Sequence, residues 1–288
     1  MLPELFLARM QRLLGTEYEA FLAAYDHPRN VGLRLNPLKT GLPPALAQFG
    51  LTPVPWAENG FYYDAQSRPG LSPYHDAGLY YLQEPSAMAP SGLLDVHPGE
   101  RVLDLCAAPG GKSFAAAIAM GGKGSIVSCD IYPHKTALIE NGAARLGLAN
   151  VTAHQQDASQ VVPEWVGAMD TVIADVPCSG LGIIRKKPDI RYKNLKELEN
   201  LPALQLKILE TQASYVKPGG TLLYSTCTVL KRENEDVVSA FLAGHGEFAT
   251  EPLPLPEVFP KNETGMLTLI PGEYDTDGFF ICRLRRKA

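Results

Sequence analysis

One stretch of the chain, residues 101–112 (RVLDLCAAPGGK), constrains the fold more than any other. Its first five residues are mostly apolar and predict a short buried strand, residues 107–111 predict a tight turn, and residues 114–120 predict an alanine-rich helix. In an open parallel sheet, ligands bind at the carboxyl end of such a strand, because backbone N–H groups and the helix dipole converge there. We therefore expect a ligand crevice at this turn, where Gly110 and Gly111 leave room for a ligand to approach the backbone.

Two ligand chemistries fit this turn. Residues 106–113 match the phosphate-binding pattern G-x-x-x-x-G-K-[ST] except at the first position, where Cys106 replaces glycine. A nucleoside pocket requires instead an acidic residue at the end of the next strand, about 20 residues beyond the glycines. Asp130 closes the apolar segment GSIVSCD at that point. Asp130 could also simply cap the helix that begins near Pro133, so the turn alone leaves these interpretations open.

After Tyr80 the sequence alternates predicted strands with predicted helices. Such alternation predicts an α/β fold with a doubly wound parallel sheet. Two further strands, 266–270 and 278–284, are joined without a helix, so the last strand is predicted to run antiparallel, as in the seven-stranded sheets of S-adenosylmethionine methyltransferases. The other predicted strands are 101–106, 124–129, 151–155, 171–174 and 221–225, and the predicted helices are 86–94, 112–120, 133–146, 195–216 and 231–242.

The first 80 residues are predicted to form a small α+β domain ahead of the main domain, which occupies residues 81–288. Residues 2–14 carry apolar side chains at helical spacing, and Thr16 with Glu19 matches a capping box for a second helix. The segment VGLRLN alternates like a strand, and residues 43–49 predict a short helix.

The composition narrows the classes of function. The chain has 288 residues, of which 45% are apolar and 20% charged, and its net charge of −5 argues against a protein that coats nucleic acid unselectively. A polynucleotide would therefore need a local basic surface. No segment has the length of a membrane span or the core of a signal peptide, and the five cysteines include no C-x-x-C pair. We expect a cytoplasmic protein without a metal site.

Two cysteines lie at strand ends that should share one edge of the sheet. Cys178 follows the predicted strand 171–174 in DVPCSG, and Cys227 follows the strand 221–225 in STCT. Packing does not explain sulfur among Pro, Ser, Thr and Gly, and a thiolate is a good nucleophile, so both are candidates for catalysis. The other cysteines lie in or beside apolar strands and are expected to pack as small hydrophobic residues: Cys106, Cys129 and Cys282.

Four motifs together resemble the signature set of the RNA 5-methylcytosine methyltransferases of the Nop/Sun family. They are DLCAAPGGK, DVPCSGLG, YSTCT and DGFF, in this order. The opening segments LPELFLARMQRLLG and VGLRLNPLK are similar to the amino-terminal module of the bacterial small-subunit rRNA methyltransferase F type. The resemblance implies a class I, Rossmann-like methyltransferase domain at residues 81–288 that uses S-adenosyl-L-methionine, and an RNA-positioning domain at residues 1–80. We expect a monomer that acts on RNA, with 16S rRNA favoured over transfer RNA.

The resemblance also implies roles for individual residues. Cytosine C5 is a poor nucleophile until a thiolate adds to C6. In the family the cysteine of the TC pair adds and that of the PC pair assists release, which assigns these steps to Cys227 and Cys178. Asp175 would contact the N3 and amino edge of the base, and Lys112 would hold or polarise it. The predicted cofactor contacts are Cys106, Ala107, Ala108, Pro109, Gly110, Gly111, Lys112, Asp130 at the ribose, Asp157 at the adenine and Asp175 at the methionine end.

A basic loop after the PC motif is the candidate RNA contact, because phosphates bind to cationic side chains. Asp189 and Glu197 interrupt this loop, so a merely solvated charged loop is the alternative. The predicted RNA contacts are Arg185, Lys186, Lys187, Arg191 and Lys193, with Arg9, Arg12, Arg29 and Arg34 of the amino-terminal domain beside them.

Three other functions compete with this interpretation. DNA cytosine methylation is disfavoured by the additional TC cysteine and by the lack of a large target-recognition insert. Phosphate-loop nucleotide hydrolysis is disfavoured by Cys106 in place of glycine. A non-catalytic RNA-binding or ribosome-assembly factor is disfavoured because both thiols and all the predicted pocket carboxylates are present.

Overall fold

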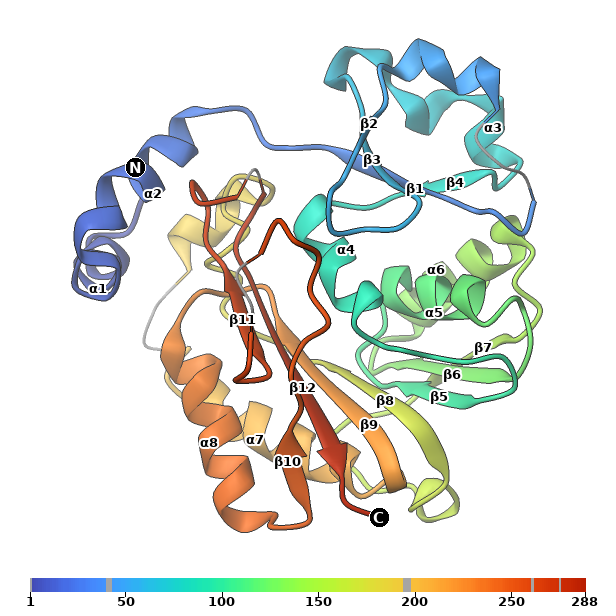
Figure 1. Cartoon of the computed structure of the whole chain (residues 1–288), viewed down its shortest axis with the longest axis vertical. Helices are drawn as coiled ribbons and strands as arrows, with labels where there is room; N and C mark the ends of the chain where they lie inside the picture. Colours follow the sequence, from blue (N-terminus) through green and yellow to red (C-terminus); the bar gives the residue numbers. More distant parts are fainter. Residues whose placement is uncertain (1, 40–42, 194–197, 260–261, 275) are drawn as a thin grey trace.

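Two sheets organise the chain (Figure 1). The computed structural model describes residues 2–39, 43–193, 198–259, 262–274 and 276–288. The larger sheet has eight strands in the order β10-β12-β9-β8-β5-β6-β7, with β11 paired to β12. These strands are β5 (Arg101–Asp104), β6 (Ser125–Asp130), β7 (Val151–Gln155), β8 (Met169–Asp175), β9 (Val216–Thr226), β10 (Phe248–Thr250), β11 (Met266–Leu269) and β12 (Phe279–Arg286).

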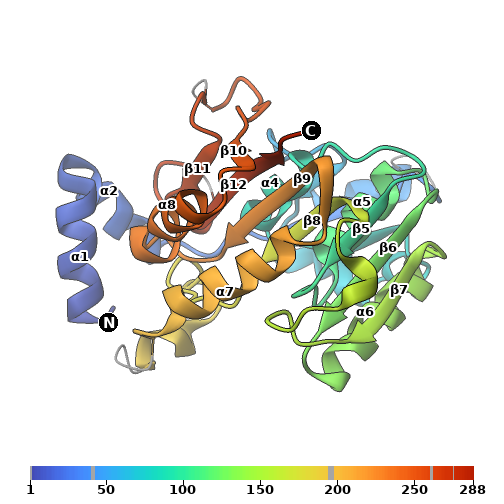
Figure 2. The same ribbon diagram turned by 90° about the horizontal axis from the view of Figure 1, so that it is seen from below.

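Helices cover both faces of this sheet, because neighbouring residues of its buried strands point to opposite faces. Val102 and Leu223 pack with α4 (Pro85–Gly92), α5 (Gly111–Ala119) and α6 (Pro133–Leu146). Their neighbours Leu103 and Leu222 pack with α7 (Leu201–Ala213) and α8 (Glu235–Gly244). Figure 2 shows α7 running along β8 and β9. None of the helices within the described residues has the length and apolar character that a membrane crossing requires.

The strand directions confirm the predicted fold class. The strands β7, β6, β5, β8 and β9 run parallel, and β12 is antiparallel to β9. The sheet has one strand more than predicted, because β10 pairs with Leu284–Arg286 of β12 while β11 pairs with Phe279–Cys282. One edge of β12 is paired with β9, so β10 and β11 both pair with its other edge. These two short strands therefore lie in line and share the seventh position of the sheet.

Several local features differ from the prediction. The predicted capping box is wrong: Thr16 lies in a 3₁₀ turn, and α2 (Tyr18–Ala23) begins after Glu17 without a side-chain cap. The segment Pro44–Phe49 is a 3₁₀ helix. The helix predicted from residue 195 begins at Leu201, and residues 194–197 lie outside the described residues.

The amino-terminal segment packs on two different parts of the molecule (Figure 1). Its antiparallel sheet has the order β2-β3-β1-β4, and the short helix α3 (Pro73–Asp76) precedes β4. Helices α1 (Glu4–Leu14) and α2 pack instead against the segments that follow β8 and β9. That apolar cluster contains Phe6, Met10, Leu14, Phe21, Leu181, Ile184, Ile190, Val229 and Leu230. The small sheet consists of β1 (Gly32–Leu35), β2 (Thr52–Pro53), β3 (Gly60–Tyr62) and β4 (Tyr80–Leu82).

Two variants of α1 test this packing. Met10 is 0% exposed, so Met10→Ala should leave a cavity and lower the free energy of unfolding by about 2–5 kcal/mol in urea denaturation. Leu13 on the same helix is 49% exposed, and Leu13→Ala should change the same quantity by less than about 0.5 kcal/mol. Equal effects of the two variants would contradict the packing of α1 against the segments after β8 and β9.

Candidate active site

Two cysteines meet where β8 and β9 end. In the parallel register of these strands, Asp175 lies opposite Ser225, so the chain leaves both strands at the same edge. Cys178 follows β8 and Cys227 follows β9, and their sulfur atoms lie 3.1 Å apart as free thiols. The structure thus brings together the two thiols that the sequence singled out.

A close backbone approach holds the loop after Cys178 in place. The Gly182 N–H donates to the Cys227 carbonyl at 3.1 Å, and the Gly278 N–H donates to the Gly182 carbonyl at 2.8 Å. A Cβ at Gly182 would lie 2.4 Å from the Gly278 carbonyl oxygen, so only glycine fits at this crossing. The loop with Cys178, the turn with Cys227 and the start of β12 are therefore tied together.

A buried carboxylate, Glu233, anchors the backbone around Cys178. Its Oε2 accepts from the Ser179 N–H at 2.8 Å and from Gln205 Nε2 at 3.0 Å. Gln205 Nε2 also donates to the Pro177 carbonyl at 3.0 Å, and the Ser179 hydroxyl donates to Thr228 at 2.9 Å. Sequence reasoning missed Glu233 and Gln205 as anchors, because nothing in their local pattern points to a partner 28 or more residues away.

A lysine and an aspartate stand beside the thiols. Lys112 Nζ lies 2.5 Å from Asp175 Oδ2, and the Ser225 hydroxyl donates to Asp175 Oδ1 at 2.8 Å. The Lys112 ammonium also lies over the Phe279 ring, 5.1 Å from its centroid. The Lys112 side chain is only 9% exposed, so its charge acts at one place in the crevice with little screening.

The two thiols have different electrostatic surroundings. The hydrogen bond with Cys178 lowers the pKa of Cys227 below the ordinary value of a cysteine; burial and Asp175 oppose this shift, and the positive charges of Lys112 and Lys187 support it. The same hydrogen bond, followed by burial and by charges that include Glu233, raises the pKa of Cys178. These opposite shifts indicate that Cys227 ionises before Cys178, and the ionised sulfur of Cys227 would then accept the hydrogen bond from Cys178.

Two cavities open at this edge of the sheet and share Asp175 and Cys227. The larger, of about 720 Å³, is lined by both thiols and by the predicted cofactor contacts Cys106, Ala108, Asp130 and Asp157. The smaller, of about 240 Å³, is lined by Ala107, Ala108, Pro109, Gly111 and Lys112.

Gly110 lines neither of these cavities, and its contact with a ligand stays a prediction. A Cβ at Gly110 would lie 2.4 Å from the Phe114 ring, and the backbone φ of +106° is unfavourable for other residues. Glycine is needed here for packing and backbone conformation.

Three carboxylates equip the crevice for a cationic or hydroxyl-bearing ligand. Asp130 accepts from the Tyr132 N–H at 3.2 Å, and Asp157 accepts from the Ser159 N–H at 2.9 Å, so both are held in place. Burial raises the pKa of Asp104 to about 7, and its Oδ1 has no hydrogen-bond partner among the described residues. Asp104 lines the smaller cavity and was missed from the sequence, where it is an interior residue of the predicted strand 101–106. No cluster with the makeup of a metal site occurs among the described residues.

The predicted RNA contacts fall into two groups. Lys186 and Lys187 are exposed and line the smaller cavity. Arg185 is corrected: its side chain is 7% exposed, pairs with the buried Asp277 at 2.8 Å and donates to the Ala24 carbonyl, so it holds the loop against α2. Arg34 is corrected too, because it is buried and donates to the Met88 carbonyl.

Among the remaining predicted RNA contacts, Arg12, Arg29 and Lys193 are exposed. Arg9 and Arg191 are partly buried. These five positions are compatible with contacts to a large ligand, which remain predictions.

The geometry has counterparts among known proteins. A family model described as 16S rRNA methyltransferase RsmB/F matches residues 91–285, and one described as the N-terminal domain of 16S rRNA methyltransferase RsmF matches residues 2–85. The chain is 34% identical over 305 residues to the ribosomal RNA small subunit methyltransferase F of Salmonella paratyphi A, an alignment that covers 99% of the chain. The chain spans 63% of the length of that relative.

Solved structures share the whole architecture. The crystal structure of PH0851 superposes with a TM-score of 0.92 at 30% identity, over 99% of this chain and 66% of that one. A methyltransferase homolog protein from Pyrococcus horikoshii superposes with a TM-score of 0.83 at 29% identity, over 98% of this chain and 94% of that one.

Alkylation by iodoacetamide tests the unequal thiols. Because the hydrogen bond from Cys178 lowers the pKa of Cys227, Cys178→Ala should move the pH midpoint of Cys227 alkylation upward, as followed by mass spectrometry of the modified peptide. The matched variant Cys106→Ala removes a thiol outside this pair and should leave the midpoint in place. A midpoint that Cys178→Ala leaves unchanged or moves downward would contradict the assignment of Cys178 as the donor.

Proposed function

Because the chain belongs to the 16S rRNA methyltransferase RsmB/F family, whose cofactor is S-adenosylmethionine, we propose that it methylates C5 of a cytosine in RNA. The observation that carries the proposal is the pair of thiols 3.1 Å apart beside Lys112 and Asp175. Methyl transfer to nitrogen or oxygen would need no cysteine, whereas C5 methylation needs a nucleophile that adds to the base and leaves again.

The crevice fits S-adenosylmethionine, which supplies an electrophilic methyl group when bound. The cofactor carries cationic ammonium and sulfonium groups, and the unpartnered Oδ1 of the buried Asp104 is suited to such a charge. Asp130 would bind the ribose hydroxyls and Asp157 the adenine, and both line the cavity of about 720 Å³. Asp175 and the turn at residues 106–111 would hold the methionine end.

Cys227 is the proposed nucleophile. Its thiolate adds to C6 of the cytosine, which forms a sulfur–carbon bond and makes C5 an enamine-like carbon. The lowered pKa of Cys227 raises the population of this thiolate at neutral pH. Lys112, fixed between Asp175 and Phe279, offsets the negative charge that develops at O2 and N3. Preorganised charges of this kind contribute a few kcal/mol each to the stability of a transition state.

Cys178 is the proposed base for release. Its pKa is raised chiefly by the bond with Cys227, so this cause disappears once the Cys227 sulfur is bound to C6. Cys178 can then lose its proton to solvent, and the resulting thiolate takes the proton from C5. The C5–C6 double bond forms, the electrons of the sulfur–carbon bond return to Cys227, and the methylated base is free. The anchors on Glu233 keep Cys178 in reach during these steps.

RNA is the proposed substrate, and rRNA of the small subunit is favoured. Lys186 and Lys187 provide exposed positive charge at the mouth of the smaller cavity, where phosphates of the strand would lie. The name of the curated relative, ribosomal RNA small subunit methyltransferase F, supports rRNA over transfer RNA. The target base must leave its stack to reach thiols that are partly buried in the crevice.

Single substitutions separate the two thiols. Cys227→Ala should lower methylation of RNA at least about a thousandfold, because no sulfur remains to activate C5. Cys178→Ala should instead accumulate a covalent complex that survives a denaturing gel, because release is blocked. A complex that formed with Cys227→Ala and not with Cys178→Ala would reverse the assignment.

Ligand-induced stabilisation tests the cofactor site. S-adenosylhomocysteine at about 100 times its Kd should raise the free energy of unfolding by about 2.7 kcal/mol, whereas ATP should not. Asp130→Asn should weaken this ligand about tenfold or more, because a charged hydrogen-bond partner is lost. Glu140→Gln, on the exposed side of α6, is the matched control and should bind normally. Stabilisation by ATP alone would favour the phosphate-loop interpretation.

A further inference from the structure

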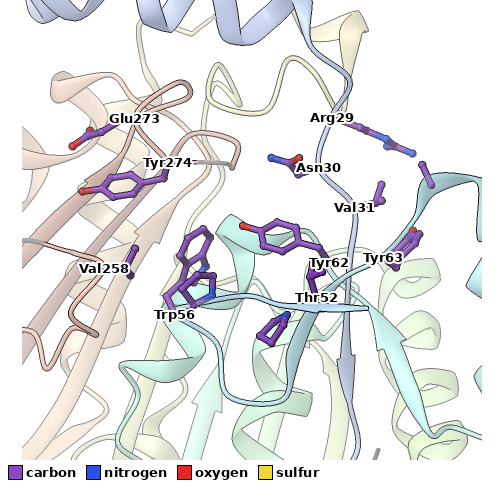
Figure 3. Close-up of a pocket in the computed structure, with 13 residues that line it drawn as sticks. Arg29, Asn30, Val31, Thr52, Trp56, Tyr62, Tyr63, Val258, Glu273 and Tyr274 are labelled. Atoms are coloured by element: carbon purple, nitrogen blue, oxygen red, sulfur yellow. The ribbon is translucent and has the colours of Figure 1, made fainter. Parts of the chain in front are cut away.

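We propose that a second, aromatic cavity binds an unpaired nucleobase of the RNA strand that carries the target cytosine. This inference rests on the proposed function and adds a substrate-positioning subsite to it. The cavity, here called the aromatic hollow, is lined by Arg29, Trp56, Tyr62, Tyr63 and Tyr274 among others and has a volume of about 610 Å³. It lies between the small amino-terminal sheet and the loop that follows β11 (Figure 3).

The aromatic side chains of the hollow form a connected, fixed array. Trp56 is 6% exposed, and its Nε1 donates to the Pro85 carbonyl at 2.8 Å, which fixes the indole ring. Tyr62 packs edge-on against Trp56, with ring centroids 6.5 Å apart. Phe259 links Trp56 to Tyr274, with centroid distances of 5.5 and 4.9 Å. A nucleobase can therefore stack on rings that lose little freedom on binding.

Shared lining residues link the hollow to the catalytic crevice by way of a third cavity. The smaller catalytic cavity shares Leu82, Gln83, Glu84 and Lys186 with a neighbouring groove of about 230 Å³. That groove in turn shares its other end with the aromatic hollow, at Arg29, Asn30, Val31 and Tyr63. One extended strand can thus run from the thiols to the aromatic rings.

The charges along this path favour a nucleic acid strand. Lys187 and Lys186 line the catalytic end, and the exposed Arg29 lies where the groove meets the hollow. Glu273 is the acidic residue of the hollow, and Figure 3 shows it with Tyr274 on the side opposite Arg29. Phosphates would therefore follow the lysines and Arg29, and the base would point between Tyr62 and Tyr274. Cationic grooves with aromatic platforms are the usual form of single-strand binding sites.

Fluorescence anisotropy with an unstructured RNA oligomer that holds one cytosine tests the subsite in the full chain. Tyr62→Leu removes the ring and keeps apolar bulk, so the Kd should rise about tenfold. Tyr62→Phe keeps the ring and should restore most of the affinity. Thermal unfolding of each variant checks that the fold is retained. An unchanged Kd for Tyr62→Leu would overturn the subsite and leave the hollow to another ligand, such as a peptide.

Arg29→Ala provides a second variant at an exposed position. Loss of one phosphate contact should lower the slope of log Kd against log salt concentration by about 0.7. Lys123→Ala is the matched control and should leave the slope unchanged. Lys123 is exposed in the turn before β6, at the amino ends of the parallel strands, whereas the thiols lie at their carboxyl ends. Equal slopes for Arg29→Ala and the wild type would contradict the path along Arg29.

Abasic nucleotides placed one at a time along the oligomer locate the stacked base. At one position other than the target cytosine, an abasic nucleotide should weaken RNA binding by the wild type about tenfold. The same abasic nucleotide should not weaken RNA binding by Tyr62→Leu any further. If the same abasic position weakens RNA binding by the wild type and by Tyr62→Leu equally, the contact between Tyr62 and that base is overturned. The covalent complex of Cys178→Ala with the same oligomer reports on the proposed function separately. If this covalent complex does not form but Tyr62→Leu still weakens RNA binding, cytosine-C5 chemistry is contradicted and the subsite is retained.

Discussion

In the large sheet, the parallel register of β8 and β9 places Asp175 opposite Ser225. Because of this register, the chain leaves both strands at the same edge, and the sulfur atoms of Cys178 and Cys227 come within 3.1 Å. The same pairing lets the Ser225 hydroxyl hold Asp175, which in turn fixes Lys112. A slip of one residue would turn every side chain of one strand to the opposite face. Apolar packing on both faces of the sheet therefore maintains the active site as well as the fold.

The two thiols differ first because of the hydrogen bond that joins them, which lowers the pKa of Cys227 and raises that of Cys178. Asp175 raises the pKa of both thiols, whereas Lys112 and Lys187 lower that of Cys227 and Glu233 raises that of Cys178. Glu233 is itself buried, and it is tolerated because Ser179 and Gln205 donate to it. One hydrogen-bonded network thus holds the Cys178 loop in place and keeps its thiol protonated while Cys227 is free.

Local sequence patterns predicted the elements and the edge of the sheet where chemistry occurs, because hydrophobic periodicity and turn residues act over a few positions. They also predicted that Cys178 and Cys227 would approach each other, since parallel strands end at a common edge. They failed where a partner lies far along the chain. Arg185 was assigned to RNA although it pairs with Asp277, and the anchoring by Glu233 went unnoticed. The aromatic hollow likewise joins residues from opposite ends of the sequence, so no local pattern could reveal it.

The central claim is that the sulfur of Cys227, and not that of Cys178, bonds to the base. An RNA oligomer with 5-fluorocytidine at the target position tests it, because fluorine at C5 cannot leave as a proton does and the covalent complex persists. Proteolysis and mass spectrometry of this complex identify the modified peptide. We expect the nucleotide to be attached to Cys227. Attachment to Cys178 would contradict it.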